Sequence, residues 1–147
     1  MNRTDVQTTR STSWVVLAVL AAIVVSIAVN TGIALATKSL DAGGTQIGLM
    51  PVAYGPATAL GIVVATIGWA TVRRRGARPA ALLRLLVPVV LVVSFVPGVI
   101  LIVVGHSALN VVGLWVMHLV VTAVTVTMLS RALPVADTNA GVANSYA

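Results

Sequence analysis

The sequence contains no cysteine and no glutamate, and its only acidic residues are Asp5, Asp41 and Asp137. The lack of cysteine excludes disulfides, thiolate metal sites and cysteine nucleophiles. Charged residues make up 8% of the chain, against about 25% in an ordinary soluble domain, and so few charges cannot cover a surface that faces water. Hydrophobic residues make up 59%, so the chain is predicted to lie in a lipid bilayer.

Four apolar runs are each long enough to cross a hydrocarbon core of about 30 Å as a helix. The fold class is therefore predicted to be all-α, a transmembrane four-helix bundle within residues 14–134. Polar segments at both ends of the chain are expected to be disordered, over residues 1–13 and 135–147. The expected helices cover about residues 14–36, 47–72, 80–104 and 108–130. Pro51 and Pro56 lie in the first half of the second run, where they predict a kinked or re-entrant start.

Basic residues fall on one side of the predicted four crossings. The first loop has Lys38, offset by Asp41, and the third loop has no lysine or arginine. By the positive-inside rule, the other loop and both ends of the chain lie in the cytoplasm. This predicts a multi-pass protein of the plasma membrane, N-in and C-in. The basic residues of the cytoplasmic side are Arg3, Arg10, Arg73, Arg74, Arg75, Arg78, Arg84 and Arg131.

A signal peptide is the alternative interpretation of the first run. Arg3 and Arg10 precede it, and Ala34-Leu35-Ala36 resembles a small-residue cleavage site. The apolar run is longer than the roughly 7–15 residues usual in such signals, so an uncleaved first helix is preferred. A mature protein that begins at Thr37 would overturn this interpretation.

Small residues recur every four positions on the first two helices, and such rows allow helix backbones to approach closely. They predict helix packing, either within the subunit or between subunits. Asn30 lies in the first row, and its amide needs partners in hydrocarbon. It is interpreted as forming an interhelical hydrogen bond, with a ligand contact as the alternative. The rows are Ala18, Ala22, Ser26, Asn30 and Ala34, and then Ala57, Gly61 and Ala65, with Gly68 close by.

His118 lies near the middle of the fourth run, where ionisable residues are rare and usually face the bundle interior. Thr122 and Trp115 share its helix face, and Ser94 is expected at a comparable depth. Three interpretations remain open: a hydrogen bond that fixes packing, a contact to a small molecule or lipid between helices, and a proton-relay or metal site. The candidate ligand-binding set is therefore His118, Thr122, Ser94, Trp115 and Asn30.

No cofactor, metal site or catalytic constellation is predicted. His106 lies twelve residues from His118, about 18 Å along a helix, so the two cannot bind one ion. The sequence contains no Gly-x-Ser-x-Gly, His-Glu-x-x-His or Walker motif. Trp14, Tyr54 and Trp69 lie towards the ends of their runs and suit anchoring at the membrane interface.

The arginine-rich second loop predicts contact with anionic lipid headgroups, at about 1 kcal/mol per basic residue. Nucleic acid is not expected, because the chain has no folded cytoplasmic domain to present the cluster. The residues concerned are Arg73, Arg74, Arg75 and Arg78.

Four segments of the chain form a recognisable pattern: Gln46-Ile47-Gly48 to Pro56-Ala57, the arginine-rich loop, Val92 to Pro97, and Met117-His118-Leu119-Val120. On these segments the chain, from about Trp14 to Pro134, resembles a family of small four-helix bacterial membrane proteins, found mostly in actinobacteria and catalogued as a domain of unknown function. The resemblance implies the four-helix topology and singles out His118. It supplies no activity.

The sequence as a whole predicts a structural or accessory membrane protein, or a binder of a hydrophobic ligand or lipid between helices. The alternative is a small transport or channel subunit that acts as an oligomer, because one bundle of four helices offers little room for an aqueous path. The expected partners are the bilayer, anionic lipids, and either further copies of the chain or a larger membrane protein.

Overall fold

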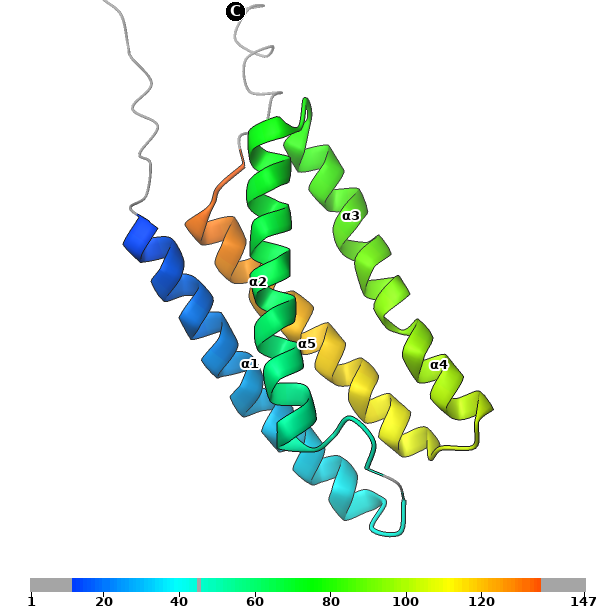
Figure 1. The fold of residues 1–147 in the computed structure, drawn as a ribbon. Coiled ribbons are helices and arrows are strands. Elements are labelled where there is room, and N and C mark those ends of the chain that lie inside the picture. The colour runs from blue at the N-terminus through cyan, green and yellow to red at the C-terminus, as the bar shows by residue number, and fades with distance from the viewer. Residues whose placement is uncertain (1–11, 45, 136–147) are drawn as a thin grey trace, which may run out of the picture.

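The computed structural model describes residues 12–44 and 46–135, and this part of the chain is helical without strands (Figure 1). Four spans are long and apolar enough to cross a membrane, and the third consists of two helices in sequence. The predicted all-α fold with four membrane-spanning helices is therefore confirmed. The helices are α1 (Thr12–Leu40), α2 (Pro51–Arg75), α3 (Pro79–Ser94), α4 (Val96–Val103) and α5 (Ala108–Ala132).

Helix α5 occupies the centre of the arrangement, because it packs against each of the other four helices. Its longest contact is with α1, which also packs against α2. Helices α3 and α4 contact α2 or α5 but not α1, and they lie on the far side of α5 (Figure 1). The third span is consequently the least enclosed by protein and the most open to lipid.

Helix α2 begins at Pro51, four residues later than the apolar run suggested. Met50 is the N-cap in an extended conformation, and Pro51 takes the first helical position. A proline has no N–H to donate, and the first helical N–H groups have no intrahelical acceptor, so this position accommodates it without loss. Pro56 lies inside the helix.

The third span is interrupted at Phe95, between Ser94 and Val96. Pro97 follows the break at the second position of α4. As at Pro51, the N–H group that proline lacks would have had no intrahelical acceptor there. Pro88 lies within α3 without ending it. The break places the ring and the carbonyl group of Phe95 against Trp115 on α5.

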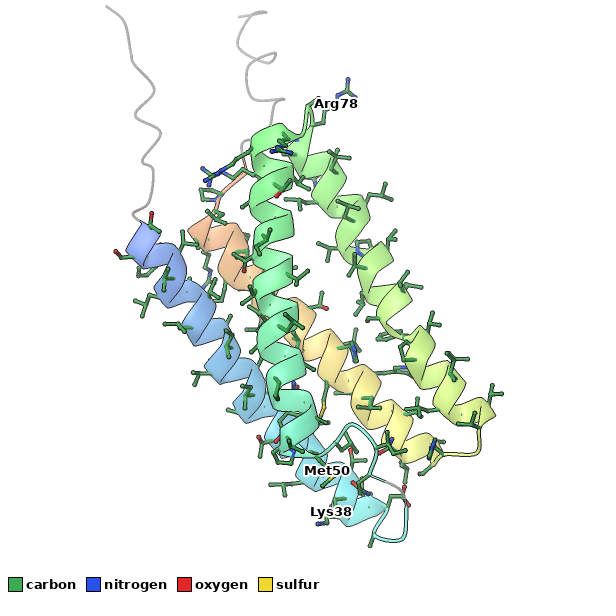
Figure 2. The ribbon with its side chains drawn as sticks, in the orientation of Figure 1. Lys38, Met50 and Arg78 are labelled. Carbon is green, nitrogen blue, oxygen red and sulfur yellow. The ribbon has the colours of Figure 1, made fainter. Side chains whose placement is uncertain are left out.

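Basic side chains gather at one end of the described bundle, which we call the basic end. Figure 2 shows Arg78 at this end, and Lys38 and Met50 at the opposite end. Arg73, Arg74 and Arg75 form the last turn of α2. Arg131 lies in the last turn of α5. Cations at helix C-termini also interact favourably with the helix dipole.

Parts of the sequence-based predictions concern residues 1–11 and 136–147, which lie outside the described residues. They include Arg3, Arg10, Asp5 and Asp137, and most of the two segments expected to be disordered.

Candidate functional site

The small-residue row of α1 forms its packing face. Ala22, Ser26, Asn30 and Ala34 are all buried. Asn30 is 1% exposed, and its Nδ2 atom donates a hydrogen bond to Oγ1 of Thr58 on α2, at 3.1 Å. The structure therefore places Asn30 in an interhelical hydrogen bond, as the first of its two interpretations predicted.

The small-residue row of α2 does not pack within the chain. Ala57, Gly61, Ala65 and Gly68 are exposed, and no heavy atom lies within 4 Å of a Cβ built at Gly61 or Gly68. Of the two predicted alternatives for this row, packing within the subunit is therefore wrong, and packing between subunits stays a prediction. The reason is that the buried face of α2 is carried by Thr58, Ile62 and Trp69, each about 100° around the helix from the neighbouring member of the row.

Two of the three expected interfacial anchors are core residues. Tyr54 is buried, and its hydroxyl group lies 2.8 Å from Oγ1 of Thr31 on α1. Trp69 is buried, and its indole N–H donates to the carbonyl oxygen of Leu133 at 3.0 Å. Each ring thus joins two segments through the polar group that would otherwise need water. Trp14 is exposed.

His118 does not face the bundle interior. Its side chain is exposed, whereas the adjacent Met117 is 4% exposed and belongs to the core. Successive residues are about 100° apart around a helix, so burial of Met117 turns His118 toward the outside of the described bundle. The expectation that the bundle would enclose this histidine is corrected accordingly.

Two of the predicted residues, Trp115 and His118, nevertheless gather with Phe95 at one place, which we call the α4–α5 seam and define by these three residues. The Phe95 and Trp115 rings have centroids 5.6 Å apart, and His118 presents its ring nearly perpendicular to Phe95 at 6.4 Å. Trp115 Nε1 donates to the carbonyl oxygen of Phe95 at 3.3 Å. Ser94 adjoins Phe95 in the chain and is partly buried.

The other two predicted residues, Thr122 and Asn30, lie outside the seam. Thr122 lies one turn beyond His118 on α5 and is half-buried. Asn30 is on α1, which does not contact the third span, so it takes no part in the seam. Phe95 was the member of the seam that sequence reasoning missed, because its role depends on the break between α3 and α4.

A second feature is a cleft of about 440 Å³ between α2, α3 and α5 at the basic end. We call it the basic-end cleft. Its volume lies within the roughly 300–1,000 Å³ usual for small-molecule sites. Arg84 and Ser130 are polar residues of the lining, and the other lining residues are apolar or aromatic. The lining is formed by Trp69, Ala80, Leu83, Arg84, Val87, Pro88, Val126, Ser130, Pro134 and Val135.

The floor of this cleft belongs to a hydrophobic cluster. Trp69 and Leu83 are each 8% exposed, and Leu129 is 2% exposed. They come from α2, α3 and α5, so the cleft rests on a packed base. Arg84 lies on α3 with an exposed side chain. The sequence pointed to Arg84 only as a basic residue near the membrane interface, because a cleft between helices depends on their separation.

Among residues 12–44 and 46–135, no group of three or more His, Asp or Glu side chains could hold a metal ion.

The four apolar spans and their packing define a multi-pass α-helical membrane protein. The family model described as "Family of unknown function (DUF6069)" matches residues 6–135. The chain therefore belongs to this family, and the predicted membership of a family catalogued as a domain of unknown function is confirmed. No curated protein and no solved structure matches the chain.

Proposed function

We propose that this protein binds an anionic lipid between its helices, in the bacterial plasma membrane. The observation that carries the proposal is the basic-end cleft, about 440 Å³ in volume. Its lining combines an apolar floor with one arginine and one serine, which is the combination that an amphiphile requires. An acyl chain would lie against Leu83, Val87 and Val126, and Arg84 would face the headgroup.

Charge at the same end of the bundle favours an anionic headgroup over a neutral one. Arg73, Arg74, Arg75 and Arg78 surround the turn between α2 and α3, next to the helix that carries Arg84. Basic residues near a membrane surface contribute about 1 kcal/mol each toward anionic lipids. Guanidinium groups also match phosphate oxygens through paired N–H donors.

Four buried polar side chains inside the spans support this proposal over an oligomeric channel. A pore formed by several copies needs polar side chains that line a shared axis. Asn30, Thr58, Asn110 and Thr125 are instead buried within a single chain. The outward row of α2, from Ala57 to Gly68, carries no polar group that could replace them.

Lipid retention tests the proposal, with a cleft-filling variant and a matched control on the same helix. Val87 lines the cleft and is half-buried, whereas Val90 is 63% exposed and does not line it. In native mass spectrometry from a mild detergent, wild type and Val90→Trp should retain anionic phospholipid. Val87→Trp should lose it, because the indole occupies the volume of the acyl chain.

The headgroup preference is tested separately with Arg84→Gln in nanodiscs of mixed phosphatidylglycerol and phosphatidylcholine. This variant should still retain a lipid but lose the preference for phosphatidylglycerol. Equal retention by wild type and Val87→Trp, or equal loss from both tryptophan variants, would show that the cleft does not hold the lipid.

The proposed lipid faces the cytoplasm, because we propose an N-in and C-in orientation from the positive-inside rule. The chain has no cysteine, so single-cysteine labelling has no background. Gly43→Cys lies in the loop before α2, and Ala77→Cys in the loop between α2 and α3; both positions are exposed. On intact cells, a membrane-impermeant maleimide should label only Gly43→Cys. Ala77→Cys should react after permeabilisation, and the reverse pattern would invert the topology.

A further inference from the structure

His118 is exposed on the outside of the described bundle at a depth where water is absent. It follows Ala108 by ten residues, about 15 Å along α5, and α5 ends at Ala132. This places it close to the middle of the span. Polar groups there need a partner, because hydrocarbon cannot supply hydrogen bonds.

The hydrogen bond that His118 already makes determines what kind of partner it needs. Its Nδ1 atom lies 2.7 Å from the carbonyl oxygen of Leu114, one turn earlier on α5. A carbonyl oxygen only accepts, so Nδ1 carries the proton. In the neutral imidazole the other nitrogen, Nε2, is then an acceptor. Within the described residues, Nε2 has no hydrogen-bond donor.

Neither Trp115, a member of the α4–α5 seam, nor Ser94, which adjoins it, supplies this donor. Trp115 Nε1 is already bonded to the carbonyl oxygen of Phe95, and the hydroxyl of Ser94 to that of Leu91 at 2.6 Å. A second copy related by a two-fold axis would bring another His118 with the same Nε2 acceptor. Phospholipid headgroups lie about 15 Å from the middle of the core, so they do not reach it.

Beside this acceptor stands an aromatic wall formed by Phe95 and Trp115. Aromatic faces and edges favour another ring, in offset or edge-to-face contact. A donor on an aliphatic chain would gain much less from the same wall. The geometry thus combines a hydrogen-bond acceptor with a ring-binding surface at one place on the lipid-facing side.

We propose that the α4–α5 seam binds a lipid-soluble phenol or hydroquinone, whose hydroxyl group donates a hydrogen bond to Nε2 of His118. The ring of the ligand packs against Phe95 and Trp115. This site lies on a different seam from the basic-end cleft, near mid-membrane, and does not depend on the lipid proposed there. It involves binding alone, with no electron transfer.

Three probes that differ in their donors test the proposal on the full-length protein in nanodiscs. Trimethylhydroquinone has two hydroxyl donors, and its dimethyl ether and its quinone have none. Under reducing conditions for the first probe, binding can be measured by quenching of tryptophan fluorescence and by the ¹⁵N shift of His118 Nε2. The hydroquinone should bind about tenfold more tightly than either analogue, the effect expected of one hydrogen bond in a dry site.

The variant His118→Phe keeps a ring and removes the acceptor, so its affinity for the hydroquinone should fall to that of the dimethyl ether. Leu119→Ala is the control, because Leu119 is also lipid-exposed but carries no polar atom. Equal binding of all three probes to wild type, or unchanged binding by His118→Phe, would overturn the proposal. Self-association of wild type that is lost in His118→Phe would also overturn it, by assigning the donor to another protein chain.

Discussion

Replacing Gly113 with alanine is expected to destabilise the protein by about 1–3 kcal/mol, the usual cost of overpacking a tight contact. Gly113 lies on α5 where it faces Thr37 of α1 at close range. A Cβ atom built at Gly113 would lie 2.6 Å from Oγ1 and 3.3 Å from Cγ2 of Thr37. Thr37 is 7% exposed, and its short β-branched side chain has little freedom to move. The two helices would therefore have to separate along their longest contact.

A compensating substitution distinguishes this steric effect from the general effect of replacing a glycine. Thr37→Ala removes both clashing atoms, so Gly113→Ala combined with Thr37→Ala should recover most of the lost stability. Gly32→Ala is the control, since no heavy atom lies within 4 Å of its added Cβ. It should be neutral or slightly stabilising, because alanine favours a helix over glycine by about 0.5–1 kcal/mol. Reversible unfolding in mixed micelles measures all four proteins. Equal effects of Gly113→Ala and Gly32→Ala would contradict the close approach.

The packing face of α1 was predictable because spacing alone reveals it. Residues four apart lie on one side of a helix, and Ala22, Ser26, Asn30 and Ala34 proved to be buried. The same spacing on α2 does not correspond to packing within the chain, and packing of this row between subunits stays a prediction. A row of small residues shows where a helix can approach another closely, but not whether a partner in the same chain does so.

For a related reason, the sequence could not predict whether the side chain of His118 faces the core or the outside of the bundle. Helical periodicity groups His118 with Trp115 and Thr122, but all three lie near the border between the packed and exposed sides of α5. Trp115 and Thr122 are half-buried and His118 is exposed. The rule that ionisable residues face inward predicted the wrong side, because His118 lies just outside the buried face of α5.

The positions of the helix ends depend partly on the local sequence and partly on tertiary contacts that the sequence does not reveal. Pro51 and Pro56 predicted a kinked or re-entrant start to the second span, yet Pro51 takes the first helical position of α2 and Pro56 lies inside it. Pro97 lies at the second position of α4. Pro88 is retained inside α3. The break at Phe95 coincides with the hydrogen bond from Trp115 on α5, a tertiary contact. The basic-end cleft likewise depends on the separation of α3 from α5, which no local pattern encodes.

The second large effect is expected at Asn30, where Asn30→Asp should destabilise the protein by about 3 kcal/mol. The substitution keeps the shape of the side chain and replaces its amide with a carboxylate. Asn30 is 1% exposed, and its Oδ1 atom has no hydrogen-bond donor among the described residues. The hydroxyl group of Thr58 could satisfy only one of about four lone-pair positions of the carboxylate. The remaining charge would stay buried between α1 and α2 without a cation.

A double-mutant cycle shows that charge, and not loss of the existing hydrogen bond, causes this effect. Asn30→Ala, Thr58→Ala and the double variant isolate the Asn30–Thr58 coupling, which should be about 0.6 kcal/mol and no more than about 1.7. The penalty of Asn30→Asp should therefore exceed the coupling several-fold in the same unfolding assay. If Asn30→Asp costs no more than the coupling, the carboxylate has reached water or a cation. The α1–α2 contact would then be open at this depth, contrary to the burial of Asn30.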